Sequence, residues 1–373
     1  MKLLYTNFHE GNGGGHTTYI RELVRVLART HDVHVAAPPT SRLYAHAAAL
    51  PGVHVVAQSF PNGLRWPSVI LRAVRQLRAY LQEHRFDVVH VNGSADHRLV
   101  INAMRGMSVR PRIVLTKHNT KPMRGLRHVL RARNHTDKVI AVCDYVRLQM
   151  EATPYRVCRP QTVYNGVDTL AFSPWNAEAA RIERERLPIA DDALLIGSSA
   201  GTGSYKGWTD LATAMNLLEE SQRRRIHVVV AGLPPSAQQL AMIRHAGLEQ
   251  QFHFPGLLDD VRPVISALDA GFVLSHDVET ISFACREMMS MGKPVMVTDY
   301  AGLPENIRTG VDGWIVPVHG HEAMAAALRN MLQDRQAVRD MGTNARAHAL
   351  AEFGLERFVS ATEAVYREVL PAG

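Results

Sequence analysis

Short apolar segments rich in β-branched residues alternate with amphipathic stretches along the whole chain of 373 residues. A first series of predicted strands comprises KLLYTN, DVHVAAP, VHVVAQ, DVVHVN, RIVLTK and KVIAVC. A second series begins near residue 194 and comprises LLIGSS, IHVVVAG, GFVLS, PVMVTD and GWIVPV. Stretches with helical periodicity, such as TTYIRELVRVLART (17–30), lie between the strands. This alternation predicts an α/β protein with parallel sheets.

The two series of strands are separated by VDTLAFSPWNAEAARIERERLPIADD (167–192), which has no strand pattern and is rich in charge. We therefore predict a linker there and two domains, 1–168 and 169–353. Each domain is expected to be a doubly wound, Rossmann-like sheet, and the two are expected to face each other across a cleft. Ligands in such sheets bind at the carboxyl ends of the strands.

Composition restricts the class of protein. Hydrophobic residues make up 46% and charged residues 21%, as in soluble globular proteins. No apolar run approaches the roughly 20 residues of a membrane span, and the first segment becomes polar too early for a signal peptide, so we predict a cytoplasmic protein.

The three cysteines, Cys143, Cys158 and Cys285, form no CxxC or Cys/His pattern. We expect reduced, mostly buried thiols and neither a disulfide framework nor a structural zinc.

Charge is distributed unevenly along the chain, whose net charge is +7. Residues 1–168 hold 24 Lys and Arg against 10 Asp and Glu, and residues 169–373 hold 18 against 25. Two basic stretches, 64–85 and 121–133, mix Arg with Leu, Val and Ile at helical spacing. Each suits a helix lying on an anionic membrane surface, and equally the solvated face of a core helix. No nucleic-acid-binding motif is present.

A glycine-rich loop, GNGGGH (11–16), follows the first predicted strand and precedes a helix. Glycines such as Gly14 and Gly15 allow a ligand to approach the backbone closely, and a helix N-terminus attracts anions. His16 occupies the third glycine position of the dinucleotide fingerprint, and no acidic residue closes the second strand, so NAD is disfavoured. The loop is either a flexible turn or a substrate-facing one.

Three further positions are candidates for ligand contacts. Lys206 lies in a second Gly/Ser-rich turn, GSSAGTGSYKGW (197–208), which is no Walker loop because Tyr205 precedes the lysine and Gly207 follows it. Lys206 either meets a phosphate there or is solvated. His118, in LTKHNT, ends a predicted strand and is either a ligand contact or structural. Asn165 belongs to an Asn-Gly turn.

HDVETISFACREMMSMGKPV (276–295) carries two glutamates, Glu279 and Glu287, eight positions apart. Glu279 lies in a polar run that a solvated helix edge would explain. Glu287 lies among apolar residues of a predicted helix, where a carboxylate requires a reason. We interpret the pair as part of a ligand site.

Ten motifs, in order, resemble those of the retaining GT-B glycosyltransferases of family 4, the group related to bacterial lipopolysaccharide and mannosyl transferases. They are GGGHTTYIRELVRVL, FDVVHVN, LTKHNT, KVIAVCDYVRLQM, VYNGVDTLAFSP, YKGWTDLATAM, FPGLLDDVRPVISALDAGFVLS, ETISFACREMMSMGKPVMVTD, AGLPENI and GVDGWIVPV. The resemblance covers nearly the whole chain, and Glu279 to Glu287 matches the E-x7-E pair of that family.

The resemblance implies a nucleotide-diphosphate sugar, UDP- or GDP-linked, bound by the C-terminal domain without cofactor or metal. Glu287 would hold the ribose hydroxyls, and Glu279 would lie near the donor sugar. The amides of Thr280, Ile281 and Ser282 would open a helix and face the diphosphate. Lys206 would neutralise the departing phosphate.

The resemblance also assigns roles to the N-terminal domain. His118 would contact the sugar across the cleft, and Gly14 and Gly15 would face the substrate. Asn165 would lie near the domain junction, and the last helix, about 354–373, would pack back on the N-terminal domain.

This chain departs from the family pattern at two places in the donor site. The family usually has Gly-Phe-Gly where this chain has Thr280-Ile281-Ser282, which makes close approach to the amides harder. The family often has an arginine where this chain has Gly201, so one positive charge on the diphosphate is missing.

The expected function is transfer of a hexose-type sugar, with retention, to a glycan or lipid-linked acceptor in cell-envelope polysaccharide or lipopolysaccharide synthesis. The basic N-terminal half suits an anionic acceptor or peripheral contact with the cytoplasmic face of the inner membrane. The alternatives are a nucleotide-sugar 2-epimerase on the same fold and a non-catalytic glycan-binding scaffold. We expect no nucleic-acid partner.

Overall fold

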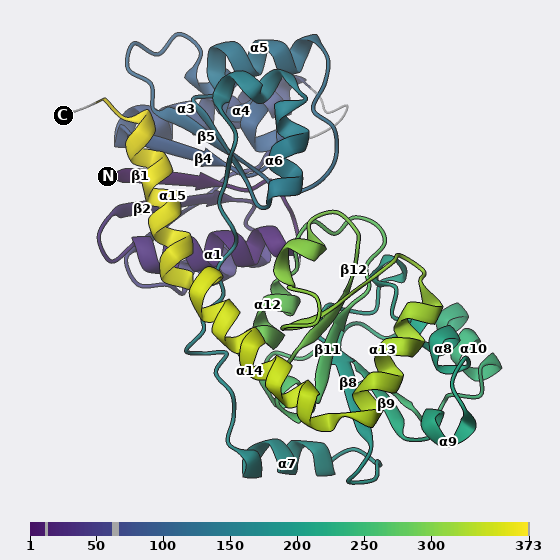
Figure 1. Ribbon diagram of the computed structural model, residues 1–373. Coiled ribbons are helices and arrows are strands. Elements are labelled where there is room, and N and C mark those ends of the chain that lie inside the picture. The colour runs from purple at the N-terminus through teal and green to yellow at the C-terminus, as the bar shows by residue number, and fades with distance from the viewer. Residues whose placement is uncertain (12–13, 62–66, 372–373) are drawn as a thin grey trace. The chain divides into compact units, whose positions relative to one another are not determined.

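The computed structural model describes residues 1–11, 14–61 and 67–371 of the chain. Two residues of the glycine-rich loop, Asn12 and Gly13, and the start of the basic stretch, 64–66, lie outside the described residues. The chain forms two compact units. Unit 1 comprises 1–166 and 355–373, and unit 2 comprises 167–354 (Figure 1).

Unit 1 contains a seven-stranded sheet in which all paired strands are parallel, in the order β3-β2-β1-β4-β5-β6-β7. The strands are β1 (Lys2–Thr6), β2 (Asp32–Ala37), β3 (Val53–Ala57), β4 (Val88–Val91), β5 (Arg112–Lys117), β6 (Lys138–Ala141) and β7 (Gln161–Thr162). The helices are α1 (Gly15–Leu27), α2 (Arg42–Ala48), α3 (Pro67–His84), α4 (Ser94–Met104), α5 (Leu126–His135), α6 (Asp144–Glu151) and α15 (Leu355–Val369), with a 3-10 turn η1 (Pro154–Cys158). The strand order reverses beside β1, which places a ligand crevice at the ends of β1 and β4.

Unit 2 contains a six-stranded parallel sheet in the order β10-β9-β8-β11-β12-β13. The strands are β8 (Leu194–Ser198), β9 (Ile226–Val230), β10 (Phe252–His253), β11 (Ala270–Val273), β12 (Val295–Thr298) and β13 (Gly313–Val316). The helices are α7 (Ala177–Glu185), α8 (Asp210–Met215), α9 (Glu220–Arg223), α10 (Ala237–His245), α11 (Arg262–Ala267), α12 (Phe283–Ser290), α13 (His321–Gln333) and α14 (Arg335–Glu352), with 3-10 turns η2 (Ser204–Lys206) and η3 (Leu303–Asn306). The order reverses between β8 and β11, so the crevice of this unit lies there. The predicted α/β fold with two doubly wound parallel sheets is confirmed.

The last helix, α15, belongs to unit 1 and packs along α1 (Figure 1). Its apolar face is buried, because it is amphipathic with Phe358, Val365 and Tyr366 on one side. The Tyr366 hydroxyl lies 2.5 Å from the Tyr5 hydroxyl of β1 and 2.6 Å from Nδ1 of His90 in β4. A buried hydrogen-bond chain thus joins the end of the sequence to the middle of the first sheet.

Residues 167–192 do not form a bare linker, and that prediction is wrong. Unit 2 begins at Val167, and this segment contributes α7, which packs on α11. Arg184 of α7 lies 3.2 Å from a carboxylate oxygen of Asp269, the residue before β11. The high charge of the segment reflects ion pairs on and around a helix.

The three cysteines are free and buried, as predicted. Burial raises the pKa of the Cys158 and Cys285 thiols to about 12, so both remain protonated at neutral pH. Among the described residues, no helix is both long enough and apolar enough to cross a membrane.

Candidate functional site

Lys206 and Glu279 meet at the carboxyl edge of the unit 2 sheet. Lys206 ends the turn η2 that follows β8, and Glu279 lies in the segment between β11 and α12. The Nζ of Lys206 lies 2.6 Å from Oε2 of Glu279, and both side chains are about 85% buried, with 15% and 13% of their surfaces exposed. The Ser275 hydroxyl donates to the same carboxylate oxygen at 3.3 Å. The two residues, 73 positions apart in sequence, form one charged centre.

A glycine brings the lysine turn against β11. Gly207, directly after Lys206, has a positive φ of 65°. A Cβ at this position would lie 2.0 Å from the carbonyl oxygen of Leu274, the residue after β11. Only glycine permits this close approach in a left-handed conformation. The sequence Lys206-Gly207 therefore places the ammonium group at the end of β11.

The segment between Glu279 and Glu287 differs in one detail from the prediction. The helix α12 begins at Phe283, so Thr280 and Ile281 precede it instead of opening it. Ser282 is its N-cap, and the Ser282 hydroxyl accepts a hydrogen bond from the amide of Cys285 at 3.3 Å. Thr280, Ile281 and Ser282 are all buried. Glu287 lies inside α12 and is half-buried, whereas the adjacent Arg286 is fully buried.

His118 lies in unit 1, directly after β5, among other histidines. Its ring packs on His16 at 4.1 Å between centroids and edge-on against Tyr19 at 4.6 Å. Burial holds the pKa of His118 well below its usual value, and the neighbouring His16 lowers it further. The pKa of His16 itself is lowered to about 3, again chiefly by burial. Both rings are therefore neutral at physiological pH.

Asn92, which follows β4, fixes the orientation of the His118 ring. The Asn92 side-chain nitrogen donates to the carbonyls of Thr6 and His90, so its oxygen faces His118. That oxygen lies 2.9 Å from Nε2 of His118, and the proton of the neutral ring is therefore on Nε2.

Asp96, in the first turn of α4, anchors this arrangement. Its Oδ2 accepts hydrogen bonds from the backbone amide of Asn92 at 2.7 Å and from the Thr6 hydroxyl at 2.9 Å. The carboxyl is fully buried, and burial raises its pKa to about 7. Sequence reasoning missed both Asn92 and Asp96, although an Asn-Gly-Ser sequence at the end of a buried strand could have drawn attention to them.

Replacing Asp96 by asparagine is expected to change how stability depends on pH. Folded Asp96 binds its proton up to about pH 7, whereas an unfolded aspartate releases it near pH 3.9. Its stabilising effect is therefore complete below about pH 4 and is lost as pH rises through about 7. Urea unfolding between pH 4 and 8 should show wild type losing stability relative to Asp96→Asn, by up to about 1.4 kcal/mol per pH unit. The histidines titrate in both proteins, so a difference that is independent of pH would contradict the assignment.

The remaining predicted residues of unit 1 make none of these hydrogen bonds. Gly14 is the N-cap of α1 and Gly15 its first residue, directly before His16, and both are exposed. Asn165 is buried in the last residues of the first segment of unit 1. The structure thus brings together Lys206 and Glu279 in unit 2. In unit 1 it joins His118 to Asn92 and Asp96.

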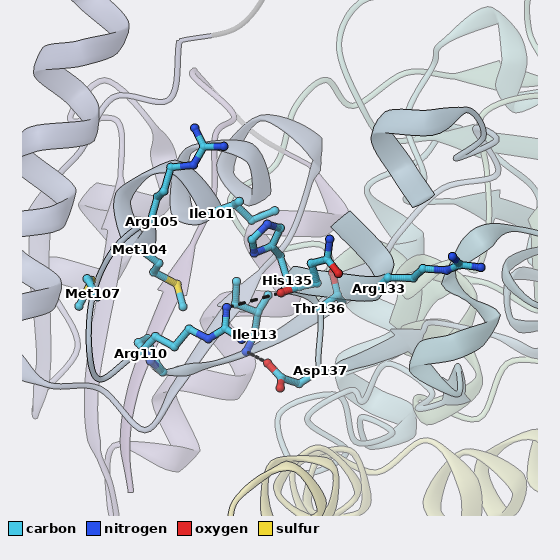
Figure 2. A pocket seen from close by; sticks show the side chains of 13 residues that line it. Ile101, Met104, Arg105, Met107, Arg110, Ile113, Arg133, His135, Thr136 and Asp137 are labelled. Atoms are coloured by element: carbon cyan, nitrogen blue, oxygen red, sulfur yellow. Dashed lines mark hydrogen bonds between the residues drawn. The ribbon is translucent and has the colours of Figure 1, made fainter. Parts of the chain in front are cut away.

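A pocket of about 320 Å³ lies at the opposite edge of the unit 1 sheet. It is lined by residues from the end of α4, the start of β5 and the end of α5, including Arg110, Ile113 and Asp137 (Figure 2). The Asp137 carboxylate accepts from the amide of Ile113 at 2.7 Å, and Arg110 donates to the carbonyl of Asn134. The pocket lies at the amino ends of the strands, so it is separate from the candidate site.

Comparison with protein families defines the class. The family model described as "Glycosyltransferase Family 4" matches residues 13–170, and the model described as "Glycosyl transferases group 1" matches residues 180–348. Among solved structures, the chain is similar to a glycosyltransferase from Rickettsia africae, with a TM-score of 0.84, 17% identity and coverage of 100% of this chain and 99% of that one. HepE from Anabaena, solved in complex with UDP, gives a TM-score of 0.82, 17% identity and coverage of 99% and 100%. The fold is GT-B, and the protein is a glycosyltransferase.

Curated relatives are similar to this chain along nearly its whole length. The N-acetyl-α-D-glucosaminyl L-malate synthase of Bacillus anthracis is 24% identical, over 96% of this chain and 94% of that protein. The GDP-mannose-dependent α-(1-6)-phosphatidylinositol monomannoside mannosyltransferase of Mycolicibacterium smegmatis is 26% identical, over 93% of each. The chain belongs to the GT-B glycosyltransferases of the family 4 type, and the resemblance seen in the sequence is confirmed.

Proposed function

We propose that this protein transfers a hexose-type sugar from a nucleotide-diphosphate sugar to a glycan or lipid-linked acceptor, with retention at the anomeric carbon and without a metal at the diphosphate. The observation that carries the proposal is the pairing of Lys206 with Glu279 beside the N-cap of α12, at the carboxyl edge of the unit 2 sheet. A cation and a helix N-terminus together suit a diphosphate.

Lys206 would assist departure of the nucleotide. As the bond from the anomeric carbon breaks, the electron pair leaves with the diphosphate, and a buried ammonium group stabilises the added charge. Glu279 now lies 2.6 Å from that ammonium and serves as its counterion. A bound donor would share the cation, and the carboxylate would face the sugar. The acceptor hydroxyl oxygen then bonds on the face from which the diphosphate leaves, and its proton passes to the departing diphosphate.

His118 would contribute as a neutral hydrogen-bonding group and not as a cation. Burial keeps the pKa of the ring low, and Asn92 holds Nε2–H. An uncharged imidazole fixed in one orientation can bind a sugar hydroxyl without attracting the diphosphate. His118 would thus serve as an uncharged hydrogen-bonding group for a sugar at the unit 1 sheet.

The comparisons support a nucleotide-sugar donor. HepE from Anabaena is solved with UDP-glucose, at 17% identity and a TM-score of 0.79, and the mycobacterial relatives are GDP-mannose-dependent. The structure of WaaG, a glycosyltransferase involved in lipopolysaccharide biosynthesis, matches with a TM-score of 0.74. We extend these properties to this chain as a nucleotide-sugar substrate and a role in cell-envelope glycan synthesis.

A panel of nucleotide sugars tests the proposal. Calorimetry with UDP, GDP and their sugars should give one site with a preferred base, and the preferred donor should be hydrolysed slowly without acceptor. An absence of binding at millimolar concentration would overturn the proposal in favour of a non-catalytic scaffold. Conversion of the donor sugar to its 2-epimer would instead identify an epimerase.

Glu287→Ala is expected to weaken nucleotide binding by about 1.5–3 kcal/mol, the range for a hydrogen bond to a charged group. The carboxylate would accept from both ribose hydroxyls, so the loss should be larger for ribonucleotides than for 2′-deoxynucleotides. Calorimetry measures both. Glu183, half-buried on α7 of the same unit, provides a matched control as Glu183→Ala. If Glu287→Ala weakened the binding of ribonucleotides and 2′-deoxynucleotides equally, Glu287 would not bind both ribose hydroxyls.

We further propose peripheral contact of unit 1 with the anionic cytoplasmic face of the membrane, through α5. Leu126 and Leu130 lie one turn apart on this helix and are 74% and 51% exposed. Arg127 lies between them in the sequence, Arg133 follows them, and both arginines are exposed. An apolar stripe beside arginines suits an anionic lipid surface.

Sedimentation with vesicles tests this contact. The protein should bind vesicles that contain phosphatidylglycerol and not vesicles of phosphatidylcholine alone, and Leu126→Asp should reduce binding about tenfold or more, since it removes apolar burial and adds repulsion. Leu170→Asp, an exposed leucine of unit 2, is the matched control. Equal loss in both variants would argue against α5 as the contact.

A further inference from the structure

Two histidines and an aspartate face one another in unit 2, at the carboxyl edge of the sheet. Asp210 is the first residue of α8, His319 follows β13, and His321 is the first residue of α13. Nδ1 of His319 lies 2.9 Å from Oδ2 of Asp210, and Nε2 of His321 lies 3.5 Å from Oδ1 of the same carboxylate. One potential ligand atom from each residue falls within 4.8 Å of the others.

We propose that Asp210, His319 and His321 form a binding site for a divalent transition-metal ion of the zinc class. Imidazole nitrogens and a carboxylate are the ligands that such ions prefer. Ligand atoms at about 2.0–2.2 Å from one tetrahedral ion lie roughly 3.3 Å apart. The two histidine–carboxylate separations, 2.9 and 3.5 Å, are close to this spacing, and all three ligand atoms lie within 4.8 Å of one another. Side-chain rotations would bring the three groups onto one ion and leave a fourth position for water.

The local backbone holds the two histidines in place. Gly320 lies between them, and a Cβ there would come within 2.8 Å of the carbonyl oxygen of Pro317, so the tight turn requires glycine. His319 has a positive φ of 57°, which is uncommon for a residue with a side chain. The histidines thereby point to the same carboxylate although they are only two positions apart.

The His321 ring carries a polar atom that requires a partner. Its Nε2 is buried although the side chain is 32% exposed, and at 3.5 Å from Oδ1 of Asp210 it makes no hydrogen bond to the described residues. A buried polar nitrogen that makes no hydrogen bond destabilises the folded protein. A metal ion between Nε2 and the Asp210 carboxylate would satisfy it.

A second cluster of the same composition, Asp32, His34 and His54 in unit 1, is less suited to a metal. The Asp32 carboxylate already pairs with Nζ of Lys2 at 2.9 Å. Both ring nitrogens of His34 are engaged, one with Asp32 at 2.9 Å and the other with the Tyr80 hydroxyl at 2.5 Å. By contrast, no lysine or arginine within the described ranges pairs with Asp210.

The proposed metal site lies beside the candidate active site and does not overlap it. His276 packs on His319 at 4.7 Å between ring centroids. Its backbone amide donates to the carbonyl of Tyr205 at 3.0 Å, in the turn that carries Lys206. Neither Lys206 nor Glu279 is a ligand, so metal binding and nucleotide binding can be measured separately, and one can fail without the other.

The test uses the full chain without a polyhistidine tag, stripped with a chelator. Calorimetry with zinc and absorption spectroscopy with cobalt(II) should show one ion per chain and the visible bands of four-coordinate cobalt. His321→Ala, the size-conserving His321→Gln and Asp210→Asn should each weaken binding at least about tenfold. His54→Ala should leave it unchanged. Circular dichroism verifies that each variant is folded.

Two results would overturn the proposal. One is the absence of stoichiometric zinc or cobalt binding by the wild-type chain. The other is metal binding that is retained in His321→Gln and Asp210→Asn and lost in His54→Ala, which would place the ion in unit 1.

Discussion

Lys206→Gln lowers kcat for sugar transfer by about 10²–10³-fold, the usual effect of removing one preorganised group that stabilises developing charge. Lys206 is the cation that meets Glu279 in the unit 2 site. Since Gly201 occupies the position where the family often has an arginine, we expect this chain to depend more heavily on Lys206 for stabilising the departing diphosphate. The substitution keeps a polar side chain of similar length, so the loss reports on charge. Initial rates of nucleotide release, with the donor identified by the binding panel, measure the effect.

Two controls accompany this experiment. Lys206→Arg retains the charge and should recover part of the rate. Lys138→Gln removes a different ion-paired lysine, 2.6 Å from Glu368 on unit 1, and should leave kcat within about twofold, as expected for surface ion pairs. A Lys206→Gln enzyme with near-normal kcat and raised KM would mean that the lysine binds the ground state and does not assist departure.

Phe358→Ala is expected to destabilise unit 1 by about 3–5 kcal/mol, the range for truncating a buried aromatic side chain. Phe358 is 2% exposed on α15 and packs edge-on against Tyr19 of α1, with 5.0 Å between the ring centroids. Removing the ring leaves a cavity between the last helix and the first, which the surrounding elements cannot fill without moving.

Hydrogen exchange measured by mass spectrometry reports on each unit separately, so it suits a two-unit protein. Amides of α1 and α15 should exchange much faster in Phe358→Ala, and amides of β11 and β12 should not change. Ser360→Ala, at an exposed position of the same helix, is the matched control. Uniform acceleration in both units would show that they unfold as one.

The fold could be predicted from the sequence because buried parallel strands appear as short apolar runs rich in β-branched residues. Eleven predicted strands, from KLLYTN to GWIVPV, correspond to observed strands. The two strands that were missed, Gln161–Thr162 and Phe252–His253, have two residues each, too few for any periodicity. The helix Ala177–Glu185 was missed because it has no buried residue, and without an apolar stripe an exposed helix resembles a linker.

The candidate site could be predicted only in part from the sequence. Lys206 and His118 could be proposed because each follows a predicted strand, where α/β sheets place ligand contacts. Glu279 could be proposed because its spacing from Glu287 matches the family pattern. Their partners could not, because Asn92 and Asp96 are defined by hydrogen bonds within a buried network. The Asp210 cluster likewise depends on a contact across 109 positions, which no local spacing reveals.

The return of α15 to unit 1 has a consequence for synthesis of the protein. Domains generally begin to fold while the chain is still being made, yet unit 1 lacks Tyr366, the hydrogen-bond partner of Tyr5 and His90, until the last residues emerge. All of unit 2 is translated before then. Unit 1 is therefore completed only after all of unit 2 has been made, and a stop codon near residue 354 would remove the helix that packs on its first sheet.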